Sequence, residues 1–270
     1  MSQHEYYATE EFVEINRVKD TYNLVVRLAE KGKDPNHIVA YFKFDLTQNG
    51  PLAANERIVF EFAEMLDIPV TAVKFLTYDN MKGHVSYAVP GDYEIWNNLE
   101  VKFAQRFGSD IRNRIRECFL DVEPFFAMIV FDCWIANTDR HGGNFIGTML
   151  PGNDKLSLYL IDHGHSLIGP VEKWNSMKQN EDAWYNVRLF IREPSIANLI
   201  TDFSQLTPYI SKIEAIDDQT IDTLVDNIPN EYLKPDEADY IKSMLKKRRN
   251  RLREMLLEWC KAEGKIKAAI

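Results

Sequence analysis

The chain has 270 residues, of which 45% are hydrophobic and 27% charged, a balance typical of folded globular proteins and not of disordered ones. Its formal net charge of −9, from 41 acidic and 32 basic side chains, repels polyanions on average and disfavours nucleic acid as a direct ligand. Three cysteines without a CxxC pair argue against a disulfide framework or a thiolate zinc site, and fit a reducing cytoplasm.

The first ninety residues are predicted to form strands and one helix. The opening residues 1–12 carry no apolar signal segment. Runs of β-branched and alternating apolar residues predict strands at 11–18, 21–29, 38–45, 70–78 and 84–89. We expect a turn at 17–20 between the first two. In the third strand the alternation places Lys43 on the face opposite Phe42 and Phe44.

A helix is predicted over residues 52–67, after the break at Asn49-Gly50-Pro51. Its apolar residues recur with the helical period, as at Ile58, Phe62 and Leu66. Three strands, a helix and two further strands together predict a small sheet with one helix packed on it.

The rest of the chain is predicted to be mostly helical. Long helices are expected at 122–136 and 236–262, and a hairpin of two strands at 144–150 and 156–162. The longest apolar run, around 124–136, is interrupted by Asp132 and is too short to cross a bilayer. We therefore expect a cytoplasmic protein without a membrane span.

The strongest chemical signal is the segment 137–144, NTDRHGGN, followed eighteen residues after Asn144 by Asp162. A buried helix delivers the loop that holds Asp139. Asn144 opens one strand of the predicted hairpin and Asp162 closes the other, and a tight hairpin brings its two ends side by side. Two carboxylates and one amide oxygen around one spot are the hard oxygen ligands that Mg²⁺ prefers.

Such a site suits phosphoryl transfer, because a metal ion must neutralise charge that spreads over the transferred phosphate oxygens. Asn144 and Asp162 are the candidate metal ligands. Asp139 is not needed as a ligand and is the candidate for orienting the attacking hydroxyl group. Lys43, on a central strand, can reach nucleotide phosphates if Glu56, on the following helix, holds it in place.

These residues together resemble the HipA-like kinases. The resemblance is carried by Lys43, Asn55-Glu56, the segment 137–144 and Asp162-His163-Gly164, in that order. The helix segment from Ala54 to Pro69 also looks like that of the HipA family, so the likeness spans about residues 40–165. The catalytic loop is similar to that of the phosphatidylinositol 3- and 4-kinases, which reads DRHxxN.

The resemblance implies a two-lobed, protein-kinase-like α+β fold. Residues 1–91 would form a small antiparallel-sheet lobe with one helix, and residues 92–270 a mostly helical lobe with the catalytic loop and the metal-binding hairpin. Asp139 would be the catalytic aspartate, with Lys43 and Glu56 completing the catalytic set.

The resemblance also implies the ligands. ATP would be bound by Lys43, Asn144, Asp162 and a hinge at Val85, Tyr87 and Val89, and Mg²⁺ by Asn144 and Asp162. The acceptor would be a hydroxyl group on an unknown protein, at serine or threonine, or on a small molecule.

Three other functions stay open. The DRH loop favours a phosphoinositide kinase, which the net acidity disfavours. No GxGxxG loop lies between the first two strands, where the sequence reads VKDT from Val18 to Thr21, and this departure motivates a nucleotide-binding pseudokinase that acts as an interaction module. A regulator that binds nucleic acid could use the basic cluster at 246–251.

Several tempting residues have plainer interpretations. The basic cluster is more simply a solvated helix face paired with acids such as Glu254 and Glu258. Trp174 and Trp184 could bind substrate, but core packing explains them equally well. Zinc ligation by His141 and His163 is disfavoured, because no thiolate or third histidine has matching spacing.

Overall fold

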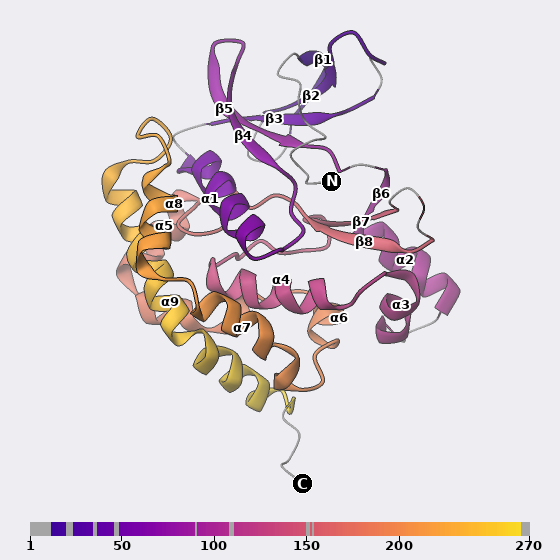
Figure 1. Ribbon diagram of the computed structural model, residues 1–270, viewed down its shortest axis with the longest axis vertical. Coiled ribbons are helices and arrows are strands. Elements are labelled where there is room, and N and C mark those ends of the chain that lie inside the picture. Colours follow the sequence, from indigo (N-terminus) through magenta and orange to yellow (C-terminus); the bar gives the residue numbers. More distant parts are fainter. Residues whose placement is uncertain are drawn as a thin grey trace.

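A computed structural model of the chain describes residues 12–19, 24–34, 37–45, 49–89, 91–107, 111–149, 152 and 154–265. Two lobes are stacked in Figure 1, an antiparallel sheet with one helix above and a mostly helical lobe below. The predicted α+β, two-lobed class is therefore confirmed.

The upper lobe contains a five-stranded antiparallel sheet in the order β1-β2-β3-β5-β4. Its elements are β1 (Phe12–Lys19), β2 (Leu24–Glu30), β3 (Ala40–Phe44), α1 (Leu52–Met65), β4 (Val73–Tyr78) and β5 (Met81–Tyr87). β3 alternates as predicted: Phe42 and Phe44 are buried in the core, and Lys43 faces the other side. α1 buries the predicted apolar stripe.

Two turns differ from the sequence prediction. The turn predicted at 17–20 is wrong for 17–19, because Arg17 pairs with Val26 and Val18 with Val25 inside the β1–β2 ladder; residue 20 lies outside the described residues. The β4–β5 hairpin turns at Asp79-Asn80, which both have positive φ (54° and 58°), as a type I′ turn requires. β5 therefore begins earlier than the predicted strand at 84–89.

The lower lobe combines a three-stranded sheet, β6-β7-β8, with helices. Its longer elements are β6 (Asp92–Ile95), α2 (Trp96–Phe107), α3 (Ile111–Cys118), α4 (Glu123–Trp134), β7 (Phe145–Met149), β8 (Leu156–Leu160), α5 (Val171–Gln179), α6 (Pro194–Ala197), α7 (Thr207–Glu214), α8 (Asp218–Asp226) and α9 (Pro235–Ala262). Short 3₁₀ turns lie at Glu181–Tyr185, Val187–Leu189 and Phe203–Gln205. The hairpin predicted from the sequence is present as β7 and β8.

α4 is the central helix of this lobe, and α7 and α9 pack against it. It is buried continuously from Phe125 to Trp134, which explains why its sequence lacks a polar face. Trp134 donates from its indole Nε1 to the Leu245 carbonyl of α9, 3.0 Å away. In the part of the chain that the structure describes, no helix is both long and apolar enough to cross a membrane. Trp174 and Trp184 are half-buried against the core, as the plainer interpretation expects.

The basic cluster at 246–251 forms ion pairs with other residues of the lower lobe. Its ion-pair partners are not the predicted Glu254 and Glu258. They lie instead on α8 and on the 3₁₀ turn at 181–185, because the side chains of the cluster on α9 face these two elements. The ion pairs join Lys246 to Asp218 and Asp222, Lys247 to Glu181, Arg249 to Asp218 and Arg251 to Asp182.

Arg248 is the exception within the cluster, since it is fully buried. Its guanidinium donates to the carbonyls of Cys133, Trp134 and Trp184, and so ties α9 to the end of α4 that leads into the segment 137–144.

Replacing Arg248 should therefore be costly. Arg248→Ala removes the donors of three carbonyls, and we expect the free energy of unfolding to fall by about 3 kcal/mol. Arg251→Ala, at an exposed position of the same cluster, should change it by less than about 0.5 kcal/mol. Urea denaturation of the two variants measures both values, and equal effects would contradict the structural role of Arg248.

Candidate active site

The segment 137–144 is held by a buried charge pair. Arg140 donates from Nε and Nη2 to the carboxylate of Asp132, at 2.8 and 3.1 Å, and both residues are buried. Nη1 of Arg140 reaches the carbonyls of Asn144 (2.5 Å) and Ile161 (3.2 Å), the residues just before β7 and just after β8. Asp132 also accepts from Asn137. One arginine therefore fixes the loop and both hairpin ends.

Asp139 lies at the accessible side of this loop, with its side chain 34% exposed. Its backbone N–H donates to Asn137 Oδ1 at 3.0 Å, which shapes the turn. Its carboxylate oxygens lie 3.6 Å from Nδ1 of His165 and 4.0 Å from Nε2 of His141. The carboxylate is thus both supported by neighbours and open to a reactant.

Asn144 and Asp162 meet at the base of the β7–β8 hairpin. The Ile161 N–H donates to the Asn144 carbonyl at 3.1 Å, one residue before Asp162. Nδ2 of Asn144 donates to the Asp139 carbonyl (2.7 Å) and to its Oδ2 (3.3 Å), which leaves the amide oxygen to serve as an acceptor or ligand. No group of three His, Cys, Asp or Glu side chains that could hold a metal ion occurs among the described residues.

Lys43 connects the two lobes electrostatically. Its Nζ lies 2.9 Å from Oδ1 of Asp162 and 3.7 Å from Oε1 of Glu56. Helix α1 is also tied to the segment after Asp162, because the buried Asn55 donates from Nδ2 to the Gly164 carbonyl at 2.9 Å. The structure therefore brings Lys43, Glu56 and Asp162 together, beside the loop that holds Asp139 and Asn144.

Glu56 is a buried anion among basic groups. Burial alone would raise the pKa of Glu56, but the Lys43 ammonium, with the rings of His163 and His84, holds it well below its usual value. Nδ1 of His163 lies 3.8 Å from Oε2, and Nε2 of His84 lies 3.8 Å from Oε1. Glu56 thus remains ionised at neutral pH.

His84 makes the stability of the protein depend on pH. Burial lowers the pKa of His84 to about 4, from an ordinary value near 6.5. The unfolded chain takes up this proton below about pH 6.5 while the folded protein does not, so folding is progressively weakened as the pH falls towards 4, by about 3 kcal/mol in total.

We therefore expect His84→Leu to lose stability less steeply than the wild type between pH 6.5 and 4. Urea unfolding at several pH values measures this, with pH 8 as the reference at which the His84 ring is neutral in both the folded and the unfolded wild type. Parallel curves for the two proteins would show that His84 is not held neutral.

A cavity of about 260 Å³ lies between the lobes next to this group. Val25 of the upper lobe and Ile95, Ile146 and Ile161 of the lower lobe give it apolar walls, and Lys43 and Asp162 line its charged end. The apolar end of this cavity therefore suits an aromatic ring. Its charged end suits an anionic group together with a bound cation.

Only part of the predicted hinge, which comprises Val85, Tyr87 and Val89, lines this cavity. Tyr87 and Val89 line it, together with Ser86 and Ala88. Val85 does not: it is buried with the core, and β5 is paired at this residue with both β3 and β4. The strand alternation turns its side chain away from Lys43 and towards Phe42.

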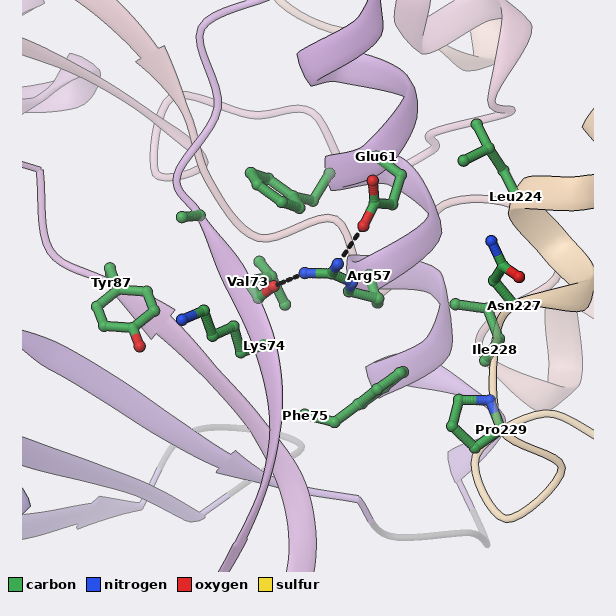
Figure 2. Close-up of a pocket in the computed structure, with 12 residues that line it drawn as sticks. Arg57, Glu61, Val73, Lys74, Phe75, Tyr87, Leu224, Asn227, Ile228 and Pro229 are labelled. Carbon is green, nitrogen blue, oxygen red and sulfur yellow. Dashed lines mark hydrogen bonds and ion pairs between the residues drawn. The ribbon is translucent and has the colours of Figure 1, made fainter. Parts of the chain in front are cut away.

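A larger cavity, about 510 Å³, lies beside α1 and β4, and no residue of the segment 137–144 lines it. Figure 2 shows it between α1, β4 and the segment Leu224–Pro229, with Arg57 reaching from α1 to the Val73 carbonyl and to Glu61. Of the predicted site residues only Tyr87 lines it. Its size does not make it the site of chemistry, because the converging acids and the lysine lie elsewhere.

The structure adds residues that the sequence did not single out. Lys173, on α5, is fully buried and donates to the carbonyls of Ala136 (2.5 Å) and His165 (2.7 Å), and burial lowers its pKa well below the usual value. Glu193 accepts from the Gly142 N–H at 2.8 Å. A third such residue is Asp132, which the sequence marked only as an interruption of an apolar helix. Nothing in the sequence marked Lys173 or Glu193.

Comparison with known proteins places this geometry in a known fold. The sequence matches no established family and no curated protein. Among solved structures, the Helicobacter pylori proinflammatory kinase CtkA is similar with a TM-score of 0.65 and 17% identity, over 94% of this chain and 96% of that one. A chain in the Shewanella oneidensis structure of the toxin–antitoxin system HipA, HipB and its operator DNA has a TM-score of 0.50 and 17% identity, over 94% and 68%.

These likenesses show that the chain has a kinase-like fold, the one found in HipA-like kinases. The fold implied by the sequence resemblance is therefore confirmed. At 17% identity the likeness concerns the fold, and the chemistry has to be argued from the site itself.

Proposed function

We propose that the protein is an ATP- and Mg²⁺-dependent kinase that transfers the γ-phosphoryl group to a hydroxyl group, of a protein serine or threonine. The observation that carries the proposal is the position of Lys43, between Glu56 and Asp162 at the charged end of an interlobe cavity, beside Asp139. We place the boundary between the nucleotide-covering lobe and the catalytic lobe at residue 91.

ATP fits the chemistry of the cavity. The aliphatic walls suit the faces of the adenine ring, and the Lys43 ammonium suits the phosphates. Tyr87 and Val89 would contact adenine through backbone groups, in a hinge that starts after Val85. No GxGxxG loop lies between the first two strands, and in this proposal Lys43 would carry a large share of phosphate binding.

Mg²⁺ fits the donor set of Asn144 and Asp162, one amide oxygen and one carboxylate, with phosphate and water oxygens as the remaining ligands. When bound, the ion neutralises charge on the transferred group. The Asp162 side chain is 39% exposed, which leaves room for a ligand next to its contact with Lys43.

Asp139 is the proposed catalytic base. It needs to hold the acceptor hydroxyl group in line with the γ-phosphate, and its carboxylate is open on one side while Asn144 fixes the other. A protein hydroxyl is the proposed acceptor because the sequence motifs resemble those of HipA-like kinases. The DRHxxN loop keeps a phosphoinositide headgroup as the second candidate.

The direct test is transfer of ³²P from γ-labelled ATP in the presence of Mg²⁺, with the protein itself, mixed protein substrates and phosphoinositide vesicles as acceptors. We expect label on protein serine or threonine, and its loss when EDTA removes the metal. Label on the lipid alone would replace the protein acceptor by the phosphoinositide. Tight ATP binding without transfer to any acceptor would favour the pseudokinase.

A further inference from the structure

We propose that His163 is a positioning residue, which couples the catalytic loop to Glu56 and through it sets the position of Lys43. The inference deepens the proposed function and rests on it. Its starting point is that His163 lies between two groups that belong to different lobes, Arg140 below and Glu56 above, and that the residue is 4% exposed.

The contact with Arg140 fixes the tautomer of the ring. Nη2 of Arg140 lies 2.8 Å from Nε2 of His163. A guanidinium group can only donate, so Nε2 must accept, and the ring proton of the neutral imidazole is on Nδ1. Nδ1–H then faces Oε2 of Glu56 at 3.8 Å. This distance is longer than a hydrogen bond, and the attraction is that of a dipole and a carboxylate in a dry interior.

Arg140 cannot follow the ring, because its other donors are already used by Asp132 and the hairpin carbonyls. The position of the ring is thus dictated by the catalytic loop. Glu56 has basic neighbours in Lys43, His84 and His163. Lys43 reaches the lower lobe through its ion pair with Asp162, whereas His163 belongs to that lobe and is held there by Arg140.

The link has a consequence for the reaction. The Glu56 carboxylate attracts Lys43 away from Asp162, whose carboxylate lies closer to Nζ. Lys43 already contacts Asp162 at 2.9 Å in this structure. If the ring did not orient Glu56, the attraction of Glu56 for Lys43 would weaken, and Lys43 would stay on Asp162 and occupy a proposed metal ligand when the nucleotide binds. Misplacement of a phosphate-binding group by about 1 Å costs on the order of 10²-fold in rate.

A double-mutant cycle tests the proposal. His163→Leu fills the space without an N–H, and we expect kcat to fall about 10²-fold in the otherwise unchanged protein but only about threefold in a Glu56→Gln background. His163→Asn retains a donor near the position of Nδ1 and should recover part of the loss. Thr148→Val, which deletes a buried hydroxyl group at the far end of β7, controls for the general cost of removing a buried polar group.

Two readouts do not depend on transferase activity. The ¹⁵N–¹H correlation spectrum of histidine-labelled protein should show the ring proton of His163 on Nδ1, because Arg140 donates to Nε2. The affinity for ATP, measured by calorimetry, should also be non-additive: the effects of His163→Leu and Glu56→Gln should not sum in the double variant. A proton on Nε2, or additive effects of His163→Leu and Glu56→Gln on affinity, would overturn the proposal even if the protein were no kinase.

Discussion

Asp139→Asn protein should bind ATP and Mg²⁺ with near-normal affinity and transfer phosphate about 10³-fold more slowly than the wild type. The amide has the shape of the carboxylate and can keep the contact with Asn144, but it neither orients nor accepts the proton of an attacking hydroxyl group. Because Asp139 is not proposed as a metal ligand, the loss should fall on kcat and leave the Km for ATP within a few-fold.

The measurement is steady-state kinetics with calorimetric binding of ATP, and the control is Asp121→Asn, an exposed carboxylate at the start of α4. The control should be fully active. If Asp139→Asn instead raises the Km for ATP and leaves kcat unchanged, Asp139 belongs to nucleotide binding and the assignment of the base is wrong.

Lys43→Met should affect both activity and folding. Transfer should fall by at least about 10²-fold, since the phosphates lose their cation. In addition, Glu56 would remain as a buried carboxylate without its ammonium partner, and breaking such a pair costs about 3–5 kcal/mol of folding free energy. The cost should shrink as the pH falls, because Glu56 can then take up a proton.

The two effects can be separated with Lys43→Met/Glu56→Gln. An uncharged amide needs no ammonium partner, so the double variant should regain most of the lost stability and remain inactive. Urea unfolding and ATP turnover are measured on the same samples. A double variant as unstable as Lys43→Met would show that Glu56 is not the reason for the loss, and an active double variant would remove Lys43 from the proposed mechanism.

Much of the fold could be predicted from the sequence, because its elements are locally encoded. The alternation around Lys43 and the helical stripe of α1 are properties of short segments, and both are present in the structure. The end of the first strand was misjudged, because Lys19-Asp20 resembles a turn locally whereas the register with β2 extends the strand through Lys19. Register is a property of two strands and is not visible in one.

The candidate site was predictable where spacing constrains geometry. A hairpin places Asn144 and Asp162 together, and a strand followed by a helix can place Lys43 near Glu56. The supporting residues could not be predicted in this way. His84 reaches Glu56 because β5 pairs with β3, and Lys173 reaches the Ala136 carbonyl, just before the segment 137–144, from a separate helix, so both depend on tertiary packing alone.

The hydrogen bond from Asn55 to the Gly164 carbonyl limits how the two lobes can move against each other. A movement that swings α1 outward would leave a buried amide and a buried carbonyl without partners, at a cost of about 1–3 kcal/mol for each. The chain segment after α1 is likewise anchored, since Leu160 donates to Pro69 and Thr71 donates to Leu160. A relative movement of the lobes should therefore bend the chain near the start of β4, while α1 stays with the lower lobe.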